Sequence, residues 1–306
     1  MYGGVVMSWF KARLGEAAVL LAAFMWGCIG LFTRNMQEKG FTSVQIVAVR
    51  AFVTVILMLI IILITDRRLL KVDLRDMWMF FGTGILSFLF FNICYMSSIG
   101  ENSLSVACIL MYTSPIWVSA LSVPLFKEAL NSVKVISFVL CFGGCVMVCM
   151  SDSLRLTKLG LVFGLLSGLG YALYSIFGKI ASTKYHTMTV TFYTFLFASI
   201  GAVPICELPK LSKLLASGTN IALSVGVAVI CTLLPYLLYT LGLSKTGAGK
   251  ASVIAILEPA VASTIGACVF GESMGITGVC GIITVMAGLV YLELGRPLPK
   301  LKRKIN

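Results

Sequence analysis

The chain has 306 residues, of which 59% are hydrophobic and only 12% are charged, and its formal net charge is +12. A soluble domain carries about 45–50% apolar and about 25% charged residues, so this composition argues against a soluble globular protein. Lipid accepts such a surplus of apolar surface, and about ten spans of roughly 20 residues each would account for the whole chain. The sequence therefore predicts an all-α integral membrane protein with ten transmembrane helices.

Ten apolar runs follow one another along the chain, joined by short connections. The first five cover residues 14–36, 43–65, 77–99, 103–126 and 132–150. The second five cover residues 159–180, 187–208, 221–244, 250–270 and 275–294. Residues 1–13 form a short segment before the first half (14–150), and a basic tail (295–306) follows the second half (159–294).

Lysine and arginine are distributed unequally between the two sides of the predicted bundle. The side of the N-terminus carries Lys11, Arg13, Arg67, Arg68, Lys71, Arg75, Lys127, Lys134, Lys179, Lys184, Lys245, Lys250 and the tail residues Arg296, Lys300, Lys302, Arg303 and Lys304. The opposite side carries Arg34, Lys39, Arg155, Lys158, Lys210 and Lys213. Because cytoplasmic loops are enriched in basic residues, both termini are predicted to be cytoplasmic.

Several other function classes lack support in the sequence. The basic residues lie in loops and not along one face, so nucleic-acid binding is not predicted. Cys141, Cys145 and Cys149 recur on one helix face inside an apolar run, without the His or acidic partners of a metal site, and are interpreted as packing residues. The chain's only histidine, His186, lies in a loop. No metalloprotease, hydrolase or phosphate-loop signature occurs, so no catalytic residue, metal or cofactor is predicted.

The second half of the chain repeats the first. At an offset of 144 residues, Tyr95 matches Tyr239, Ala107 matches Ala251, Pro115 matches Pro259, Phe126 matches Phe270, Glu128 matches Glu272, and Gly144 matches Gly288. Each half holds an odd number of helices, so two copies must lie upside down relative to each other. This is the inverted-repeat plan of secondary transporters, which bind substrate near the membrane midplane.

These motifs resemble the drug/metabolite transporter superfamily, EamA type. The matching residues are Trp26-Gly27, Arg50-Ala51-Phe52, Ala107, Pro115 and Glu128 in the first half, and Ala251, Leu257-Glu258-Pro259 and Phe270-Gly271-Glu272 in the second. The second half departs from the first at Tyr171-Ala172, which replaces Trp-Gly, and it has no counterpart of Arg50. The resemblance implies ten helices around a central cavity, transport without ATP hydrolysis, and substrates such as amino acids, other metabolites or drugs, with export favoured over uptake.

Two charged residues inside predicted helices are candidates for coupling or charge recognition. Glu258 is the only acid near the centre of a predicted span and could bind a proton or a cationic group. The alternative is that it supports the backbone next to Pro259. Arg50 could face the cavity and bind an anionic group. The alternatives are that it snorkels to the interface or packs against backbone carbonyls.

Prolines, aromatic residues and glycines complete the set of candidates. Pro115, Pro235 and Pro259 are predicted to bend three helices, with or without exposing backbone groups to substrate. Candidate substrate-binding residues are Trp26, Asn92, Tyr95, Tyr112, Tyr171, Tyr174, Tyr236 and Tyr239, for which packing is the alternative. Gly160, Gly164 and Gly168 are interpreted as a seam for close helix contact.

The sequence thus predicts a multi-pass secondary transporter that moves a small metabolite, amino acid-like or drug-like, by alternating access. It is expected in a bacterial cytoplasmic membrane, with membrane lipids and a small-molecule substrate as partners, protons as a candidate coupling ion, and no nucleic acid. An importer of a choline-like cation is the alternative within transport. A membrane sensor or scaffold that transports nothing is the alternative from another class.

Overall fold

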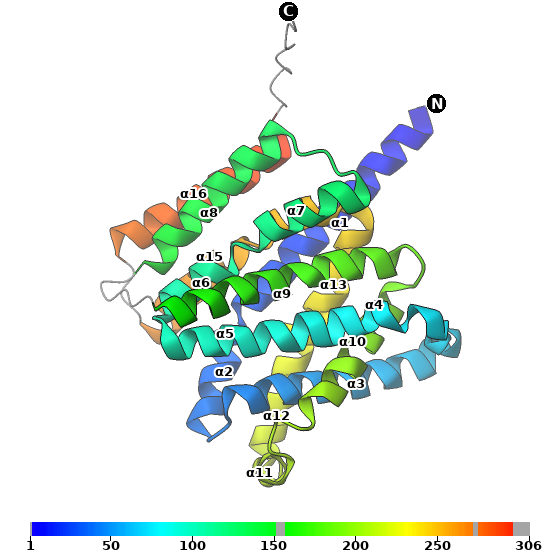
Figure 1. The fold of residues 1–306 in the computed structure, drawn as a ribbon, viewed down its shortest axis with the longest axis vertical. Coiled ribbons are helices and arrows are strands. Elements are labelled where there is room, and N and C mark those ends of the chain that lie inside the picture. Colours follow the sequence, from blue (N-terminus) through cyan, green and yellow to red (C-terminus); the bar gives the residue numbers. More distant parts are fainter. Residues whose placement is uncertain (1, 151–156, 272–274, 296–306) are drawn as a thin grey trace, which may run out of the picture.

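In the part of the chain that the computed structural model describes, every secondary-structure element is helical (Figure 1). The structure describes residues 2–150, 157–271 and 275–295, and the side chains from residue 13 onward. Arg155, Glu272, the side chain of Lys11 and the predicted basic tail beyond residue 295 lie outside this description. Within it, the first half contains α1 (Tyr2–Gly27), α2 (Ile29–Glu38), α3 (Ser43–Thr65), α4 (Met77–Phe81), η3 (Gly82–Leu89), α5 (Phe90–Glu101), α6 (Leu104–Met111), α7 (Ser114–Phe126) and α8 (Ser132–Cys149).

The second half has a similar order of elements, with one long helix in place of α1 and α2 and with a short α-helix in its second connection. It contains α9 (Lys158–Ser182), α10 (Thr187–Ala202), the short α11 (Leu208–Leu214), α12 (Gly218–Ala228), η4 (Val229–Leu233), α13 (Leu234–Thr246), α14 (Ala248–Ile254), α15 (Leu257–Phe270) and α16 (Ile276–Leu294). Two short 3-10 helices, η1 (Arg67–Leu70) and η2 (Leu74–Asp76), connect α3 to α4.

The predicted fold class is confirmed: the protein is an all-α, multi-pass membrane protein. In the described residues, nine helical segments are long and apolar enough to span a membrane, and α10 is a shorter apolar helix. The predicted seventh helix was wrong at its C-terminal end. It was expected to reach residue 208 but ends at Ala202. Pro204 lies two residues further on and has no amide to donate to the Ile200 carbonyl, so the helical hydrogen bonds cannot continue through it, and Pro209 follows in the same connection.

Side-chain caps fix where several of these helices begin. The Thr42 hydroxyl accepts a hydrogen bond from the Gln45 amide at 3.2 Å, and the Gln45 side chain accepts one from the Thr42 amide at 3.0 Å. Thr157 caps α9 through the Gly160 amide at 2.9 Å. Each cap satisfies amide groups that the first turn of a helix leaves unpaired, which matters most near lipid.

Two kinds of helix interruption recur at matching places in the two halves. A π-helical segment lies inside the third spanning helix (η3) and inside the eighth (η4). The fourth spanning segment breaks between α6 and α7, and the ninth breaks between α14 and α15. Pro115 and Pro259 each lie in the first turn after their break, where the missing amide costs no hydrogen bond.

The packing of helices follows the same pattern in both halves. Helix α1 packs on α13, and α9, which occupies the place of α1 in the second half, packs on α5. Helices α3 and α10 pack on each other, as do α8 and α16, which lie side by side along one edge of the bundle in Figure 1. Exchanging the two halves therefore leaves these contacts unchanged.

Backbones approach closely between α8 and α16. A Cβ atom on Gly144 would lie 2.6 Å from the Gly281 carbonyl oxygen, and one on Gly281 would lie 2.7 Å from the Gly144 carbonyl oxygen. Both positions therefore require glycine, as in other small-residue helix contacts in membranes. On α9, Gly160, Gly164 and Gly168 likewise lie against Asn102, Leu110 and Thr113.

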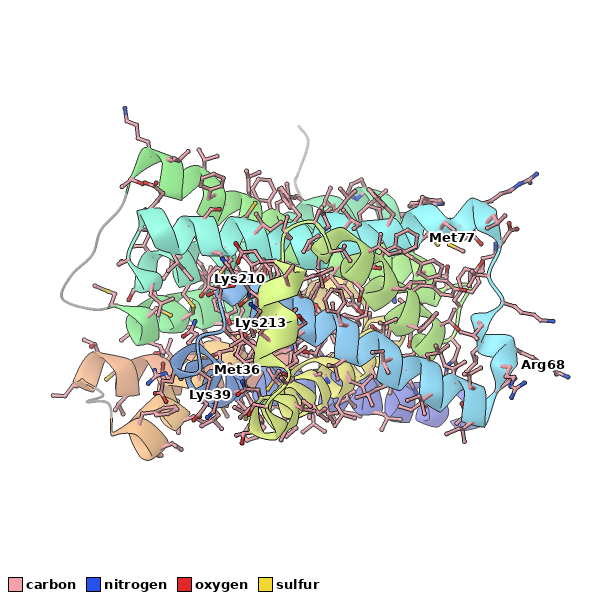
Figure 2. The ribbon with its side chains drawn as sticks, turned by 90° about the horizontal axis from the view of Figure 1, so that it is seen from below. Met36, Lys39, Arg68, Met77, Lys210 and Lys213 are labelled. Carbon is pink, nitrogen blue, oxygen red and sulfur yellow. The ribbon has the colours of Figure 1, made fainter. Side chains whose placement is uncertain are left out.

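Basic side chains mark both ends of the bundle. Figure 2 shows Arg68, in the connection between α3 and α4, far from Lys39, Lys210 and Lys213. Lys184 follows α9 and forms an ion pair with Asp76 at the same end as Arg68. The loops that the sequence assigns to the side of the N-terminus and to the opposite side therefore lie at opposite ends of the helices, as a membrane-spanning arrangement requires.

Candidate functional site

A cavity of about 510 Å³ extends from the middle of the bundle toward one end. Both halves contribute to its wall. Its lining includes Trp26, Ile29, Gly30, Thr33, Arg34, Gln37, Ser43, Ile46, Val47, Arg50, Phe91, Asn92, Tyr95, Met96, Ile99, Leu104, Cys108, Met111, Tyr112, Tyr171, Tyr236, Glu258, Pro259 and Ala262. Its volume is in the range of pockets that bind small organic molecules, about 300–1,000 Å³.

The mouth of the cavity lies at the end of the bundle where α2 turns into α3 and α5 turns into α6. Arg34 and Gln37 of α2 line it and are exposed, and Leu104 at the start of α6 is also exposed. The Arg34 guanidinium carbon lies 4.2 Å from the centre of the Phe270 ring. The entrance is therefore partly cationic, with an aromatic ring holding the cation in place.

Arg50 reaches the cavity from α3 and is fixed by η4 of the other half. Its Nε donates a hydrogen bond to the Thr232 hydroxyl at 2.9 Å, and its Nη2 donates to the Cys231 carbonyl at 3.4 Å. The Cys231 carbonyl lies four residues before Pro235, which has no amide to donate to it. Arg50 thus both contacts backbone, which was the structural alternative, and lines the cavity, which was the functional one.

Glu258 reaches the cavity from the first turn of α15, next to the break between α14 and α15. The hydroxyl groups of Tyr112 and Tyr171 lie beside its carboxylate. Among the described residues, neither Glu258 Oε2 nor the Tyr171 hydroxyl has a partner at hydrogen-bonding geometry, although both atoms are buried from solvent. Buried polar atoms without partners are costly, so these neighbouring atoms can pair with each other after a small movement or with a polar group in the cavity.

Six of the eight predicted substrate-binding residues line the cavity. They are Trp26, Asn92, Tyr95, Tyr112, Tyr171 and Tyr236. The Asn92 amide donates to the Phe88 carbonyl at 2.6 Å, which fixes its orientation. Trp26 forms an edge-on contact with Tyr236, with ring centroids 5.3 Å apart, so the aromatic rings support one another as a wall.

The other two predicted residues, Tyr174 and Tyr239, lie outside the cavity lining, on the side away from its mouth. The hydroxyl groups of Tyr174 and Thr240 are hydrogen-bonded at 2.6 Å, and those of Tyr239 and Ser175 at 2.8 Å. Tyr174 and Tyr239 line a separate void of only about 10 Å³ that shares Trp26 with the main cavity. They form the floor that separates the cavity from the other end of the bundle.

The three prolines differ in position. Pro259 lines the cavity, whereas Pro115 and Pro235 are buried outside its lining. Sequence reasoning did not select Arg34 or Thr232 for the site. Arg34 was counted as an outside charge, although its place after Trp26 in the same predicted span could have suggested a place in the same wall. No sequence signal singled out Thr232.

Beyond the floor, polar contacts join the helices at the end opposite the mouth. Glu128, after α7, accepts hydrogen bonds from the Ala248 amide at 2.8 Å and from the Gly249 amide at 3.1 Å, at the start of α14. Lys250 of α14 forms ion pairs with Glu16 of α1 and, at 3.3 Å, with Glu293 of α16. These contacts hold α14 against α1, α7 and α16, so the cavity is closed at this end.

Comparison with known proteins decides the family. The EamA-like transporter family matches residues 13–150 and again residues 158–294. The chain belongs to the EamA-like transporter family. It is therefore a membrane transporter, and the family's model matches each of its halves.

Relatives from archaea and bacteria agree with this assignment. An uncharacterized transporter of Archaeoglobus fulgidus is 27% identical over 93% of this chain and 98% of its own length. The uncharacterized transporter YxxF of Bacillus subtilis is 25% identical over 91% of this chain and 89% of its own length. The uncharacterized inner membrane transporter YicL of Salmonella typhimurium is 22% identical over 93% of this chain and 96% of its own length. A solved crystal structure, 13% identical, has the same fold, with a TM-score of 0.76 over 90% of this chain and 95% of its own.

Proposed function

We propose that this transporter moves an amino acid-like metabolite by alternating access, with export favoured over uptake. The observation that supports this most is that the Arg50 guanidinium and the Glu258 carboxylate both lie in the lining of a single aromatic-walled cavity, with a second guanidinium, Arg34, at its mouth. A zwitterion presents one anionic and one cationic group, so it complements both charges at once. The Trp26 and tyrosine rings of the same lining suit an apolar or aromatic side chain.

Alternating access is supported by a difference between two matching half-helices. In the first half, α6 lines the cavity through Leu104, Cys108 and Met111. In the second half, α14 is buried almost throughout and is held by Glu128 and Lys250. If the two halves exchange conformations, α14 lines a cavity at the opposite end and α6 becomes buried. The same sequence repeat can therefore present the binding site to either side.

The inverted repeat is supported by the recurrence of local structure at matching positions. The π-helical segments, the helix breaks before Pro115 and Pro259, and the left-handed backbone of Lys127 and Gly271 all recur in the two halves. We propose a two-fold axis in the membrane plane that relates them.

A choline-like cation is the second candidate substrate, imported in that case. Glu258 and the tyrosine-rich wall favour it, because aromatic faces attract quaternary ammonium groups. Arg50 in the same lining opposes it, because a guanidinium repels a substrate that carries only positive charge.

A counterflow assay distinguishes these functions. Purified protein in proteoliposomes preloaded with one unlabelled amino acid is expected to accumulate the same labelled amino acid for at least one of the common amino acids. The matching amine, which lacks the carboxylate, should compete poorly. Counterflow of choline without that of any amino acid would establish the second candidate. Absence of flux for both would point to another metabolite or a drug as the substrate.

The orientation in the membrane is a separate prediction. Because the loop between α3 and α4 carries Arg67, Arg68, Lys71 and Arg75, we expect it and both termini on the cytoplasmic side of a bacterial membrane. A single cysteine placed at exposed Leu74, in a cysteine-free background, should resist an impermeant maleimide in intact cells and react after permeabilisation. A cysteine at Lys39 should react in intact cells. The reverse pattern would contradict the orientation and would turn the cavity mouth toward the cytoplasm.

A further inference from the structure

We propose that Thr232 is a positioning residue that holds the Arg50 guanidinium in the orientation needed to bind a substrate carboxylate. This inference rests on the proposed function, in which Arg50 receives the anionic group of an amino acid-like solute. It adds a residue that does not line the cavity and acts only through Arg50.

The hydroxyl group of Thr232 has both of its hydrogen-bonding roles in use. It donates to the Val227 carbonyl at 3.3 Å, five residues earlier in the chain, and accepts from Arg50 Nε at 2.9 Å. Because its proton is used on Val227, its lone pair faces Arg50. Thr232 is fully buried, so no solvent can take over this acceptor role.

The remaining donors of Arg50 form the part of the guanidinium that a carboxylate can bind. Nε contacts Thr232, and one Nη2 proton contacts the Cys231 carbonyl. A guanidinium has five N–H groups in one plane, so three remain, and one Nη1 proton and the second Nη2 proton form a parallel pair. Without the Thr232 hydroxyl, Nε would be buried without an acceptor, and the guanidinium would turn to find one.

Both π-helical segments take part in this arrangement. Thr232 lies in η4, and Phe88, whose ring centre is 5.6 Å from the guanidinium carbon of Arg50, lies in η3. Phe88 and Thr232 are 144 positions apart, so they are counterparts in the sequence repeat. π-helical turns recur at functional sites because they displace side chains from regular helix positions. Here they place one side chain from each half against a single arginine that has no counterpart of its own.

Thr54 provides a matched control within the same pair of helices. It lies one turn after Arg50 on α3, is fully buried, and donates to the Ala228 carbonyl at 3.5 Å. A change of Thr54→Val removes a buried hydroxyl from the same interface without removing a contact to Arg50. Thr232→Ser keeps the acceptor, whereas Thr232→Val keeps the shape and removes it.

The test measures equilibrium binding of L-phenylalanine and phenethylamine, which differ by the carboxylate, to the purified full chain. In Thr232→Val we expect L-phenylalanine to bind about tenfold more weakly, because a hydrogen bond to a charged group is lost. Phenethylamine should bind within twofold of the wild type. Thr232→Ser and Thr54→Val should resemble the wild type for both probes, and Thr232→Val should have no further effect in an Arg50→Lys background.

Each other outcome overturns a defined part of the argument. Equal weakening of both probes in Thr232→Val, or no weakening of either, refutes the positioning role while leaving the proposed function intact. Wild-type protein that binds L-phenylalanine no more tightly than phenethylamine refutes the carboxylate site itself. In that case the proposed function fails at its substrate class, before Thr232 is considered.

Discussion

Replacing Glu258 with glutamine is expected to give a folded protein that has lost flux driven by a pH gradient. Glutamine keeps the size and the hydrogen-bonding oxygen of the side chain but cannot take up or release a proton. If Glu258 is the coupling residue, imposed pH gradients should no longer drive net accumulation of substrate, with at least a tenfold loss of rate, which corresponds to about 1.4 kcal/mol. Counterflow exchange at equal pH should persist.

The reason lies in how the surroundings of Glu258 would change between two states. In the structure its carboxylate lies beside the Tyr112 and Tyr171 hydroxyls at the end of an open cavity. It is in the first turn after the break between α14 and α15. Movement of α14 would alter hydration and hydrogen bonding at Glu258, and both change the proton affinity of a carboxyl group. A carboxyl placed at such a joint can bind a proton in one state and release it in the other.

Two measurements separate this role from a structural one. Glu38→Gln is the matched control, because Glu38 is an exposed acid at the end of α2 that lies outside the cavity lining. It should retain full pH-driven flux. Near-normal pH dependence in Glu258→Gln would assign Glu258 to support of the backbone near Pro259, and the chain would then offer no acid in the middle of a span for coupling.

The helices could be predicted from the sequence because each one depends on the apolar character of its own segment. Backbone inside lipid must satisfy its own hydrogen bonds, so each long apolar run forms a helix, and the run at residues 43–65 coincides with α3. The end of the seventh helix was missed because composition remains apolar past Ala202, while Pro204 has no amide for the next helical hydrogen bond. Apolar content predicts burial in lipid but not backbone conformation.

The sequence predicted which helix faces point toward the site more accurately than it predicted how far along each helix the cavity extends. Tyr171 and Tyr174 lie three residues apart on α9, and Tyr236 and Tyr239 lie three residues apart on α13. Such spacing places both members of a pair on one helix face. Only the first member of each pair lines the cavity, because the second lies one turn nearer the floor. That depth depends on which end of the bundle is closed, and closure is set by α14 and Glu128, which belong to opposite halves.

The contacts of Arg50 also could not be predicted from the sequence, because they join the two halves of the chain. Its partners Cys231 and Thr232 are 181 and 182 residues away in the sequence. From its residue type alone, Arg50 could face the cavity, snorkel to the membrane interface or pack against backbone carbonyls. Only the packing of α3 against η4 shows that it contacts backbone and cavity together.

The contact between α8 and α16 gives the second large expected effect, because its glycines allow two backbones to touch. Gly144→Ala would place a Cβ atom 2.6 Å from the Gly281 carbonyl oxygen and 2.8 Å from the Val285 amide nitrogen. Neither backbone atom can turn away as a side chain can, so the helices must separate. We expect a loss of about 2–3 kcal/mol of folding free energy, in the range of overpacked cores. The loss should appear as a lower midpoint of thermal unfolding in detergent.

The neighbouring glycine, Gly143, supplies a control for which we expect a gain in stability and not a loss. A Cβ atom on Gly143 would have no neighbouring heavy atom within 4 Å, apart from its own chain neighbours and its own helix backbone. Gly143→Ala therefore introduces no clash, and it reduces the freedom of the unfolded chain, which stabilises by about 0.4–1 kcal/mol. The two variants differ by one position in the same helix, so expression, detergent and helix propensity affect them alike. Equal thermal midpoints for Gly144→Ala and Gly143→Ala would show that α8 and α16 do not meet at this glycine. A drop confined to Gly144→Ala would place the contact between the last helices of the two halves at this seam.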